Sequence, residues 1–176
     1  PDLVSIKQAC AAVGQCGLMK FYEDGFAALG LTTAQVLLTE DDFSIRPRYL
    51  SLRDTLCRLL ELGVVPIINQ NDTVSTNELR AYKDKGVKVC FGDNDKLSAL
   101  VAGGLDADLL VILSDINGLY DSDPRKNKDA KLIAEVKAIT PEIESAAGGA
   151  SKRGRGGMKT KLEAAKVVTH SGCAMV

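Results

Sequence analysis

The sequence predicts an α/β fold with a mostly parallel sheet between two layers of helices. Two short, nearly continuous apolar runs, residues 64–69 and 108–113, are typical of strands that are covered on both faces. Stretches with the three- to four-residue apolar repeat of helices stand before, between and after these runs. Strands that alternate with helices form βαβ units, which is why a parallel sheet is expected.

The first half of the chain contains two predicted helix–strand pairs. Residues 2–30 carry apolar side chains at the helical repeat, weakened in the middle by two glycines. Residues 33–39 are β-branched and apolar, which is typical of a strand. A second helix follows Pro47 and is ended by Gly63, after which the strand at 64–69 begins.

The second half continues the alternation beyond a polar stretch at residues 70–95, which is expected to contain a hairpin. The last helix is entered from a glycine-rich loop. The expected elements are a helix from Leu97 to Gly103-Gly104, strands at 108–113 and 131–136, a helix at 141–147 opened by Thr140, and a helix at 157–171.

The composition is that of one globular domain. The chain has 176 residues, and one domain per roughly 100–200 residues is usual. With 22 basic and 23 acidic side chains the formal charge is −1, which disfavours a nucleic-acid partner. No run approaches the roughly 18 apolar residues of a membrane span. We therefore expect a soluble protein that binds neither nucleic acid nor a membrane.

The five cysteines indicate a reducing compartment. They are scattered, odd in number and without a C-x-x-C pair, so neither a disulfide framework nor a zinc site is predicted. A cytoplasmic location fits this pattern best.

Both ends of the chain fall inside predicted elements. The chain opens at Pro1, directly before a helix, and stops at Val176, where an apolar strand is beginning. We expect a domain that is incomplete at the N-terminus and at the C-terminus.

Polar clusters follow the predicted strands and precede a helix. Asn69-Gln70-Asn71-Asp72 and Ser114-Asp115 come directly after the two apolar runs, and Gly92-Asp93-Asn94-Asp95 opens the helix at Leu97. Ligands of open α/β sheets bind beyond the carboxyl ends of the strands, so three clusters at one edge indicate a ligand site. The structural alternatives are a helix N-cap at Asp93 or Asp95 and an Asx turn at Asn71-Asp72.

A glycine-rich loop at residues 154–161 is a candidate anion site. Its glycines let backbone amides approach a phosphate, the following helix N-terminus adds partial positive charge, and Lys161 can reach a transferring phosphoryl group. The spacing is not that of a G-x-x-x-x-G-K-[ST] P-loop, because the lysine follows the threonine. A surface loop with a basic tip is the alternative interpretation.

Four segments of the chain resemble a known family. PIINQND, FGDNDKLSALVA, LLVILSDINGLYDSDPR and GRGGMKTKLEAAK are similar, in order and spacing, to the glutamate 5-kinase family of the amino-acid kinase superfamily. The SD-x-x-GLY-x-x-DPR and GGM-x-TK segments are shared in variant form by aspartokinases, acetylglutamate kinases and uridylate kinases. The pair N-x-ND and GDND-x-LSA is more particular to glutamate 5-kinases. The resemblance covers essentially the whole chain.

The resemblance implies a three-layer α/β/α domain that transfers the γ-phosphoryl of ATP to the side-chain carboxylate of L-glutamate, the first step of proline biosynthesis. Mg²⁺ is the implied cofactor, with no residue assigned as its ligand. Carried over onto this sequence, glutamate is held by Asp72 and Asn94, with Asn69 and Asp93 shaping the same pocket. The nucleotide contacts are Ser114, Asp115, Arg155, Gly156, Gly157, Met158, Lys159, Thr160 and Lys161. Lys161 also neutralises charge on the phosphates, and Asp95 orients the lysines around the transferred group.

The chemistry of the residues agrees with this implication. A carboxylate acceptor is already ionised, so phosphoryl transfer to it needs cations and positioning groups and no general base. The one histidine, His170, falls late in the last helix, where a structural role is expected. The cysteines have no base beside them in sequence and are expected to be small core or surface residues.

The chain departs from the family pattern in two places. The strand and K-x-G-S loop that open family members are not in this sequence, and the stretch 80–90 is longer than in common bacterial forms. The resemblance also implies homo-oligomers and feedback inhibition by L-proline at a site that overlaps the glutamate pocket. For residues 80–90 a solvated hairpin is the default interpretation, and a lid over that pocket is the alternative hypothesis. The alternatives are another amino-acid kinase, of aspartokinase or uridylate kinase type, and a nucleotide-binding module without turnover.

Overall fold

The computed structural model describes residues 3–74, 93–146 and 157–176, which form two compact units. Unit 1 is Pro1–Cys90 and unit 2 is Phe91–Val176, and each is described by itself. Both combine helices with parallel strands, as expected for an α/β protein. None of the described helices is long and apolar enough to cross a membrane.

The described part of unit 1 is a two-stranded parallel sheet with helices. Its elements are α1 (Leu3–Ala27), β1 (Thr32–Leu38), α2 (Asp41–Ser44), α3 (Arg46–Glu61) and β2 (Val64–Gln70). The strands pair in register from Thr32 opposite Val64 to Leu38 opposite Gln70. Gly63 has a φ of +70° and ends α3, because only glycine adopts this left-handed conformation without strain.

Most of unit 1 agrees with the elements predicted from sequence, apart from α2. Thr39, predicted as the end of a strand, instead binds the carboxylate of Asp42 through its N–H at 2.7 Å and its hydroxyl at 2.8 Å. This local contact satisfies a backbone donor beyond β1 and starts the short helix. Leu38 and Leu56 are the buried apolar side chains of the unit's described part, with 4% and 2% exposure.

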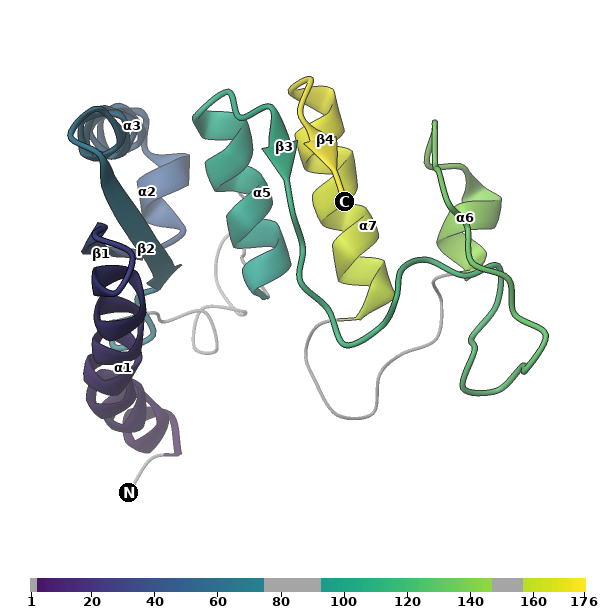
Figure 1. Cartoon of the computed structure of the whole chain (residues 1–176), viewed down its shortest axis with the longest axis horizontal. Helices are drawn as coiled ribbons and strands as arrows, with labels where there is room; N and C mark the ends of the chain where they lie inside the picture. Colours follow the sequence, from purple (N-terminus) through teal and green to yellow (C-terminus); the bar gives the residue numbers. More distant parts are fainter. Residues whose placement is uncertain (1–2, 75–92, 147–156) are drawn as a thin grey trace. The chain divides into compact units, whose positions relative to one another are not determined.

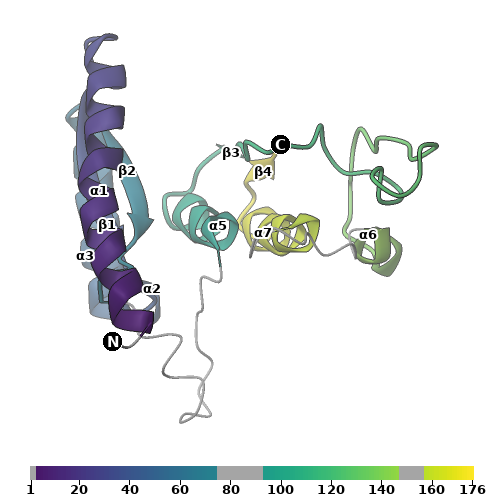
Figure 2. The ribbon, with the colours of Figure 1, turned by 90° about the horizontal axis from the view of Figure 1, so that it is seen from below.

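Unit 2 is built on a pair of helices that lie side by side. Its described elements are α5 (Asn94–Gly104), β3 (Leu109–Leu110), α6 (Pro141–Ala146), α7 (Met158–His170) and β4 (Ala174–Met175). Figure 2 shows α5 and α7 nearly end-on, next to each other. β3 and β4 are parallel, with Leu109 opposite Ala174.

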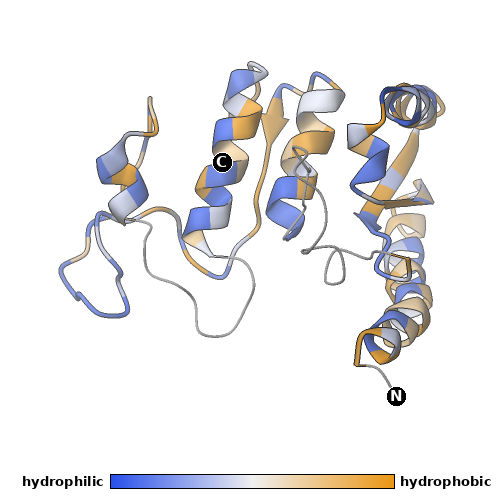
Figure 3. Cartoon of the chain, turned by 180° about the vertical axis from the view of Figure 1, so that it is seen from behind, coloured by the Kyte–Doolittle hydropathy of each residue, from blue (hydrophilic) through white to orange (hydrophobic). Residues whose placement is uncertain are grey.

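The core of unit 2 lies between α5 and α7. Small side chains fill it: Ala99, Ala164 and Val168 are fully buried, and Leu110 and Met175 pack against them from the strands. At the C-terminal end of α5, Gly103 allows the chain to lie close to Ser171, because a Cβ at position 103 would lie 2.9 Å from the Ser171 Oγ. Figure 3 shows β3 coloured as apolar, which agrees with its place against this core.

Two strand predictions in unit 2 are corrected by the structure. The strand predicted at 108–113 is assigned only at Leu109–Leu110, although its backbone bonds to β4 continue to Ile112, whose N–H lies 2.7 Å from the Val176 carbonyl. The strand predicted at 131–136 is not formed; Leu132 makes an isolated antiparallel bridge with Tyr120. Nearly all of that segment is exposed, so it has no apolar face to bury, and its backbone bonds to residues 119–121 extend no further than Lys131 and Ile133 among the described residues.

Candidate active site

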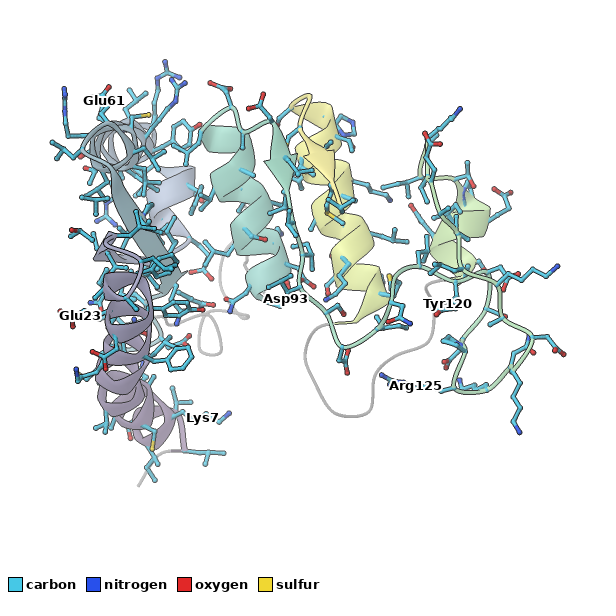
Figure 4. The ribbon with its side chains drawn as sticks, in the orientation of Figure 1. Lys7, Glu23, Glu61, Asp93, Tyr120 and Arg125 are labelled. Atoms are coloured by element: carbon cyan, nitrogen blue, oxygen red, sulfur yellow. The ribbon has the colours of Figure 1, made fainter. Side chains whose placement is uncertain are left out.

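The N-terminus of α5 is capped by Asp93. Its Oδ1 accepts a hydrogen bond from the Lys96 N–H at 3.2 Å, which confirms the N-cap alternative for this residue. The other oxygen, Oδ2, is buried and has no hydrogen-bond partner among the described residues. A buried carboxylate oxygen without a donor is costly, so this atom is suited to accept a hydrogen bond from a ligand. Figure 4 labels Asp93 at the foot of α5.

The N-terminus of α7 is organised by the hydroxyl of Thr160. Gly157 is the N-cap, and its N–H donates to the Thr160 Oγ1 at 3.0 Å. The Gly157 carbonyl accepts the first helical bond, from the Lys161 N–H at 3.3 Å. A complete capping box needs a side chain on the N-cap residue, which glycine lacks. Only the other half of the box is therefore formed here, by the Thr160 hydroxyl and the Gly157 N–H.

Asp95 joins the two helix starts. Its carboxylate accepts hydrogen bonds from the Lys161 Nζ, at 3.0 Å to Oδ2 and 3.3 Å to Oδ1, and from the Thr160 hydroxyl at 2.8 Å to Oδ2. The Lys161 and Asp95 side chains are 20% and 14% exposed. Water therefore screens this ion pair less than it screens the exposed pairs of the protein.

Two helix N-termini and the Lys161 ammonium lie at the same end of unit 2. The N-termini of α5 and α7 lie at the same end of the helix pair, and the chain runs toward that end after β3 (Figure 1). Free N–H groups and the dipoles of both helices favour an anion there. With the Lys161 ammonium beside them, this end of the unit is suited to bind a phosphate group.

Ser114 and Asp115, the predicted nucleotide contacts after β3, are both exposed. The Asp115 Oδ2 lies 3.8 Å from an Nη of Arg125, an exposed pair that fixes neither side chain tightly. Arg125 belongs to the loop between β3 and α6 and is labelled in Figure 4. The side chains of Ser114 and Asp115 are therefore both accessible to a ligand.

The predicted glutamate contacts fall in both units. In unit 1, Asn69 lies near the end of β2, where its Nδ2 donates to the Gln15 Oε1 of α1 at 3.2 Å and its Oδ1 accepts from the Gln70 N–H at 2.9 Å. Asp72 follows in a turn and is exposed. Asn94 is the first residue of α5 and is exposed beside the half-buried Asp93.

Some predicted residues lie outside the part of the chain that the structure describes. These are Arg155 and Gly156 of the glycine-rich loop and the whole stretch 80–90. Of the remaining nucleotide segment, Met158 is half-buried and Lys159 is exposed, while Thr160 and Lys161 point to Asp95.

Three contacts were missed by the sequence interpretation. The Thr160 hydroxyl binds Asp95 as well as its own helix start, Gln15 supports Asn69 from α1, and Arg125 pairs with Asp115. The DPR triplet was a signal for Arg125. No local pattern in the sequence indicates the partners of Thr160 or Gln15, which are 65 and 54 residues away.

Comparisons with known proteins find glutamate 5-kinases that are similar to this chain along nearly its whole length. The chain is 54% identical over 173 residues to the glutamate 5-kinase of Pseudomonas paraeruginosa, an alignment that covers 98% of this chain and 44% of that protein. It is 52% identical over 174 residues to the glutamate 5-kinase of Methanosarcina barkeri, covering 98% of this chain and 43% of the relative. It is also 52% identical over 177 residues to the glutamate 5-kinase of Pseudomonas syringae pv. tomato, an alignment that covers 100% of this chain and 45% of that protein. This chain thus spans less than half the length of these curated relatives.

The family assignment rests on a match along the whole chain. The family model described as "Amino acid kinase family" matches residues 2–176, and so includes both helix starts and the glycine-rich loop that leads into α7. The parallel strands of both units are in keeping with that match. By this match and by its identity to these relatives, the chain belongs to the amino acid kinase family.

Proposed function

We propose that the full-length protein transfers the γ-phosphoryl group of ATP to the side-chain carboxylate of L-glutamate, giving L-glutamyl 5-phosphate, the first step of proline biosynthesis. The observation that carries the proposal is the Lys161–Asp95 pair, held where the N-termini of α5 and α7 meet. The 52–54% identity to glutamate 5-kinases supports the choice of acceptor. Under this proposal Lys161 and Asp95 belong to the catalytic machinery.

Lys161 fits a role in phosphoryl transfer. Charge spreads over the oxygens of the transferred group in the transition state, and a fixed ammonium stabilises it without having to reorganise. Asp95 holds the Nζ with both carboxylate oxygens, so the ammonium is oriented before substrate arrives. His170 is remote from this chemistry, because it lies at the C-terminal end of α7 with its Nδ1 2.6 Å from the Lys166 carbonyl.

From the resemblance to glutamate 5-kinases, glutamate binding is assigned to Asp72 and Asn69 of unit 1 and to Asn94 and Asp93 of unit 2. The α-ammonium of glutamate needs acceptor oxygens, and its carboxylates need donors. The orphaned Asp93 Oδ2 and the exposed Asp72 carboxylate supply acceptors, and the Asn94 amide supplies donors. L-Proline carries the same α-carboxylate and a similar amine, so we also propose that it competes with glutamate as a feedback inhibitor.

The nucleotide is assigned to Ser114, Asp115 and the segment 155–161. In the described residues no three acidic, cysteine or histidine side chains converge on a metal site. Mg²⁺ commonly keeps several waters and binds through substrate phosphates with one or two carboxylates. We propose that Mg²⁺ enters with the nucleotide as MgATP, where it would screen phosphate charge, and no residue of this chain is assigned to it.

The finer architecture belongs to the same proposal. We assign the chain to a three-layer α/β/α sandwich, in a cytoplasmic homo-oligomer that binds neither nucleic acid nor a membrane. The parallel strands and the family match support the α/β fold in this assignment, and its other parts come from the composition and from the resemblance.

The test is an acceptor profile of the full-length protein. It is incubated with MgATP and L-glutamate, L-aspartate or a nucleoside monophosphate, the released ADP is measured, and acyl phosphate is trapped as the hydroxamate. Glutamate-dependent ADP release with glutamyl hydroxamate is expected. Turnover on aspartate or a monophosphate instead supports another amino-acid kinase, and nucleotide binding without any turnover supports a regulatory module.

A further inference from the structure

The hydroxyl of Thr160 lies among more partners than one hydrogen can serve. Its oxygen is 2.8 Å from the Asp95 Oδ2, 2.8 Å from the Gly157 carbonyl and 3.0 Å from the Gly157 N–H. The N–H is a donor, so it occupies a lone pair of the hydroxyl. The two oxygen acceptors then compete for the single hydroxyl hydrogen.

Asp95 is the stronger of the two acceptors. A hydrogen bond to an ionised carboxylate is roughly twice as strong as one to a neutral carbonyl. The Gly157 carbonyl also has another donor, the Lys161 N–H at 3.3 Å, and is satisfied without the hydroxyl. The Thr160 hydrogen therefore points to Asp95, and its oxygen caps α7.

We propose that Thr160 is a positioning residue of phosphoryl transfer, which fixes the Asp95 carboxylate and through it the Lys161 ammonium, and that its hydroxyl is not a nucleotide ligand. This inference rests on the proposed function and replaces the nucleotide contact that the sequence suggested for the Thr160 side chain. Thr160 acts on Oδ2, the oxygen that also makes the shorter contact with Lys161. The Asp95 carboxylate therefore cannot turn away from the ammonium without breaking the bond from Thr160 as well as the two bonds from Lys161.

The β-branched side chain suits this role. Threonine has few χ1 rotamers in a helix, so its hydroxyl is held in one direction once the backbone is fixed. Thr160 is half-buried in the first turn of α7, where the capping bond to Gly157 fixes the same rotamer. The start of α7 and the orientation of Asp95 are therefore set by one oxygen atom.

The test uses Thr160→Val, Thr160→Ser and a matched control, Thr169→Val, in the full-length protein. Valine keeps the shape of threonine and removes the hydroxyl, whereas serine keeps the hydroxyl. Thr169 lies on the same helix and bonds only to helix carbonyls, that of Ala165 at 2.7 Å, among the described residues. Rates are measured with MgATP and L-glutamate, at concentrations that give kcat and both KM values.

The expected result is a split between kcat and KM. Thr160→Val lowers kcat by about tenfold or more and leaves the KM for ATP within about twofold, since a misplaced ammonium is felt mainly in the transition state. Thr160→Ser keeps kcat within about threefold of wild type, and Thr169→Val has wild-type kinetics. A Thr160→Val protein with raised KM for ATP and unchanged kcat would make the hydroxyl a nucleotide ligand and overturn the proposal. Unchanged kcat per folded molecule with a lower Tm would reduce Thr160 to a helix cap and overturn it as well.

A second measurement does not depend on which compound accepts the phosphoryl group. Thermal unfolding is followed for Thr160→Val, Asp95→Asn and the double variant. Because Thr160 acts on Asp95, the Tm loss of the double variant is expected to be clearly smaller than the sum of the two single losses. Additive losses would contradict the proposed contact. Wild-type protein without glutamate-dependent turnover would contradict the proposed function alone, since this thermal cycle would still decide the role of Thr160.

Discussion

The ion pair between Lys161 and Asp95 leads to a quantitative prediction about stability. The perturbation is a double-mutant cycle of Lys161→Met, Asp95→Asn and both together. Methionine keeps the length of the lysine stem, and asparagine keeps the shape of the carboxylate, so each change mainly removes a charge. The measured quantity is the coupling between the two changes in the free energy of unfolding.

The magnitude follows from the distance and the exposure of the pair. Two unit charges 3.0 Å apart attract by about 5 kcal/mol at an effective dielectric constant of about 20. Desolvation of both charges cancels much of this, and exposed pairs contribute only about 0–1 kcal/mol. The side chains retain 20% and 14% exposure, between the buried and exposed limits. We therefore expect a coupling of about 1.5 kcal/mol.

Urea unfolding of the full-length protein provides the assay, with a control pair on α1. Lys20 and Asp24 make a similar contact, 2.8 Å, but their side chains are 71% and 63% exposed. The cycle of Lys20→Met and Asp24→Asn should give a much smaller coupling that vanishes in high salt, whereas that of Asp95 and Lys161 should largely persist. Equal couplings for the two pairs would refute the argument that partial burial strengthens the Asp95–Lys161 pair.

Three further predictions concern the core, the glutamate pocket and α6. Val168→Ala removes a fully buried side chain between α5 and α7, and urea unfolding should show a loss of about 2 kcal/mol; a loss near zero would mean that this core is not formed. Asp72→Ala and Asn94→Ala should raise the KM for glutamate far more than that for ATP in steady-state kinetics, because each removes a group from the proposed glutamate pocket; the opposite pattern would exchange the two pockets. A hydrogen bond from Thr140 lowers the pKa of Glu142 in the folded protein below its ordinary value of 4.5. The ionised Glu142 side chain therefore stabilises the folded state above pH 4.5, and this contribution is lost as the pH falls through the lowered pKa. An NMR titration of Thr140→Ala should return the Glu142 pKa toward 4.5, and an unmoved value would exclude Thr140 as its cause.

Much of the fold was predictable because its signals are local. The helical repeat, the capping residue and the terminating glycine lie within a few residues of one another, and this is why α1, α3, α5 and α7 were expected within a few residues of their observed bounds. Strands are less local, because a strand exists only through its partner. Residues 131–136 look like a strand in sequence, but only Leu132 has a pairing partner, so the prediction was wrong.

The candidate site was predictable as a set of residues and not as an arrangement. Polar clusters at strand ends and helix starts indicated Asp93, Asp95 and Lys161, since helix N-termini bind anions in many folds. The sequence left open which of Asp93 and Asp95 caps α5. The structure assigns the cap to Asp93, and the Asp95 side chain points to α7.

The contact between Asp95 and Lys161 depends on how α5 and α7 are aligned, and not on either helix alone. Both residues lie in the first turn or just beyond it, so their side chains meet only if the two helices start at the same level. Alanines at the interface allow the helices to approach, and the register of Leu109 opposite Ala174 fixes the strands that follow them at the same level. A one-residue slip of either helix would move its start by about 1.5 Å and turn it by about 100°. The pair, 66 residues apart in sequence, is therefore set by packing and by sheet register, which no local pattern in either helix encodes.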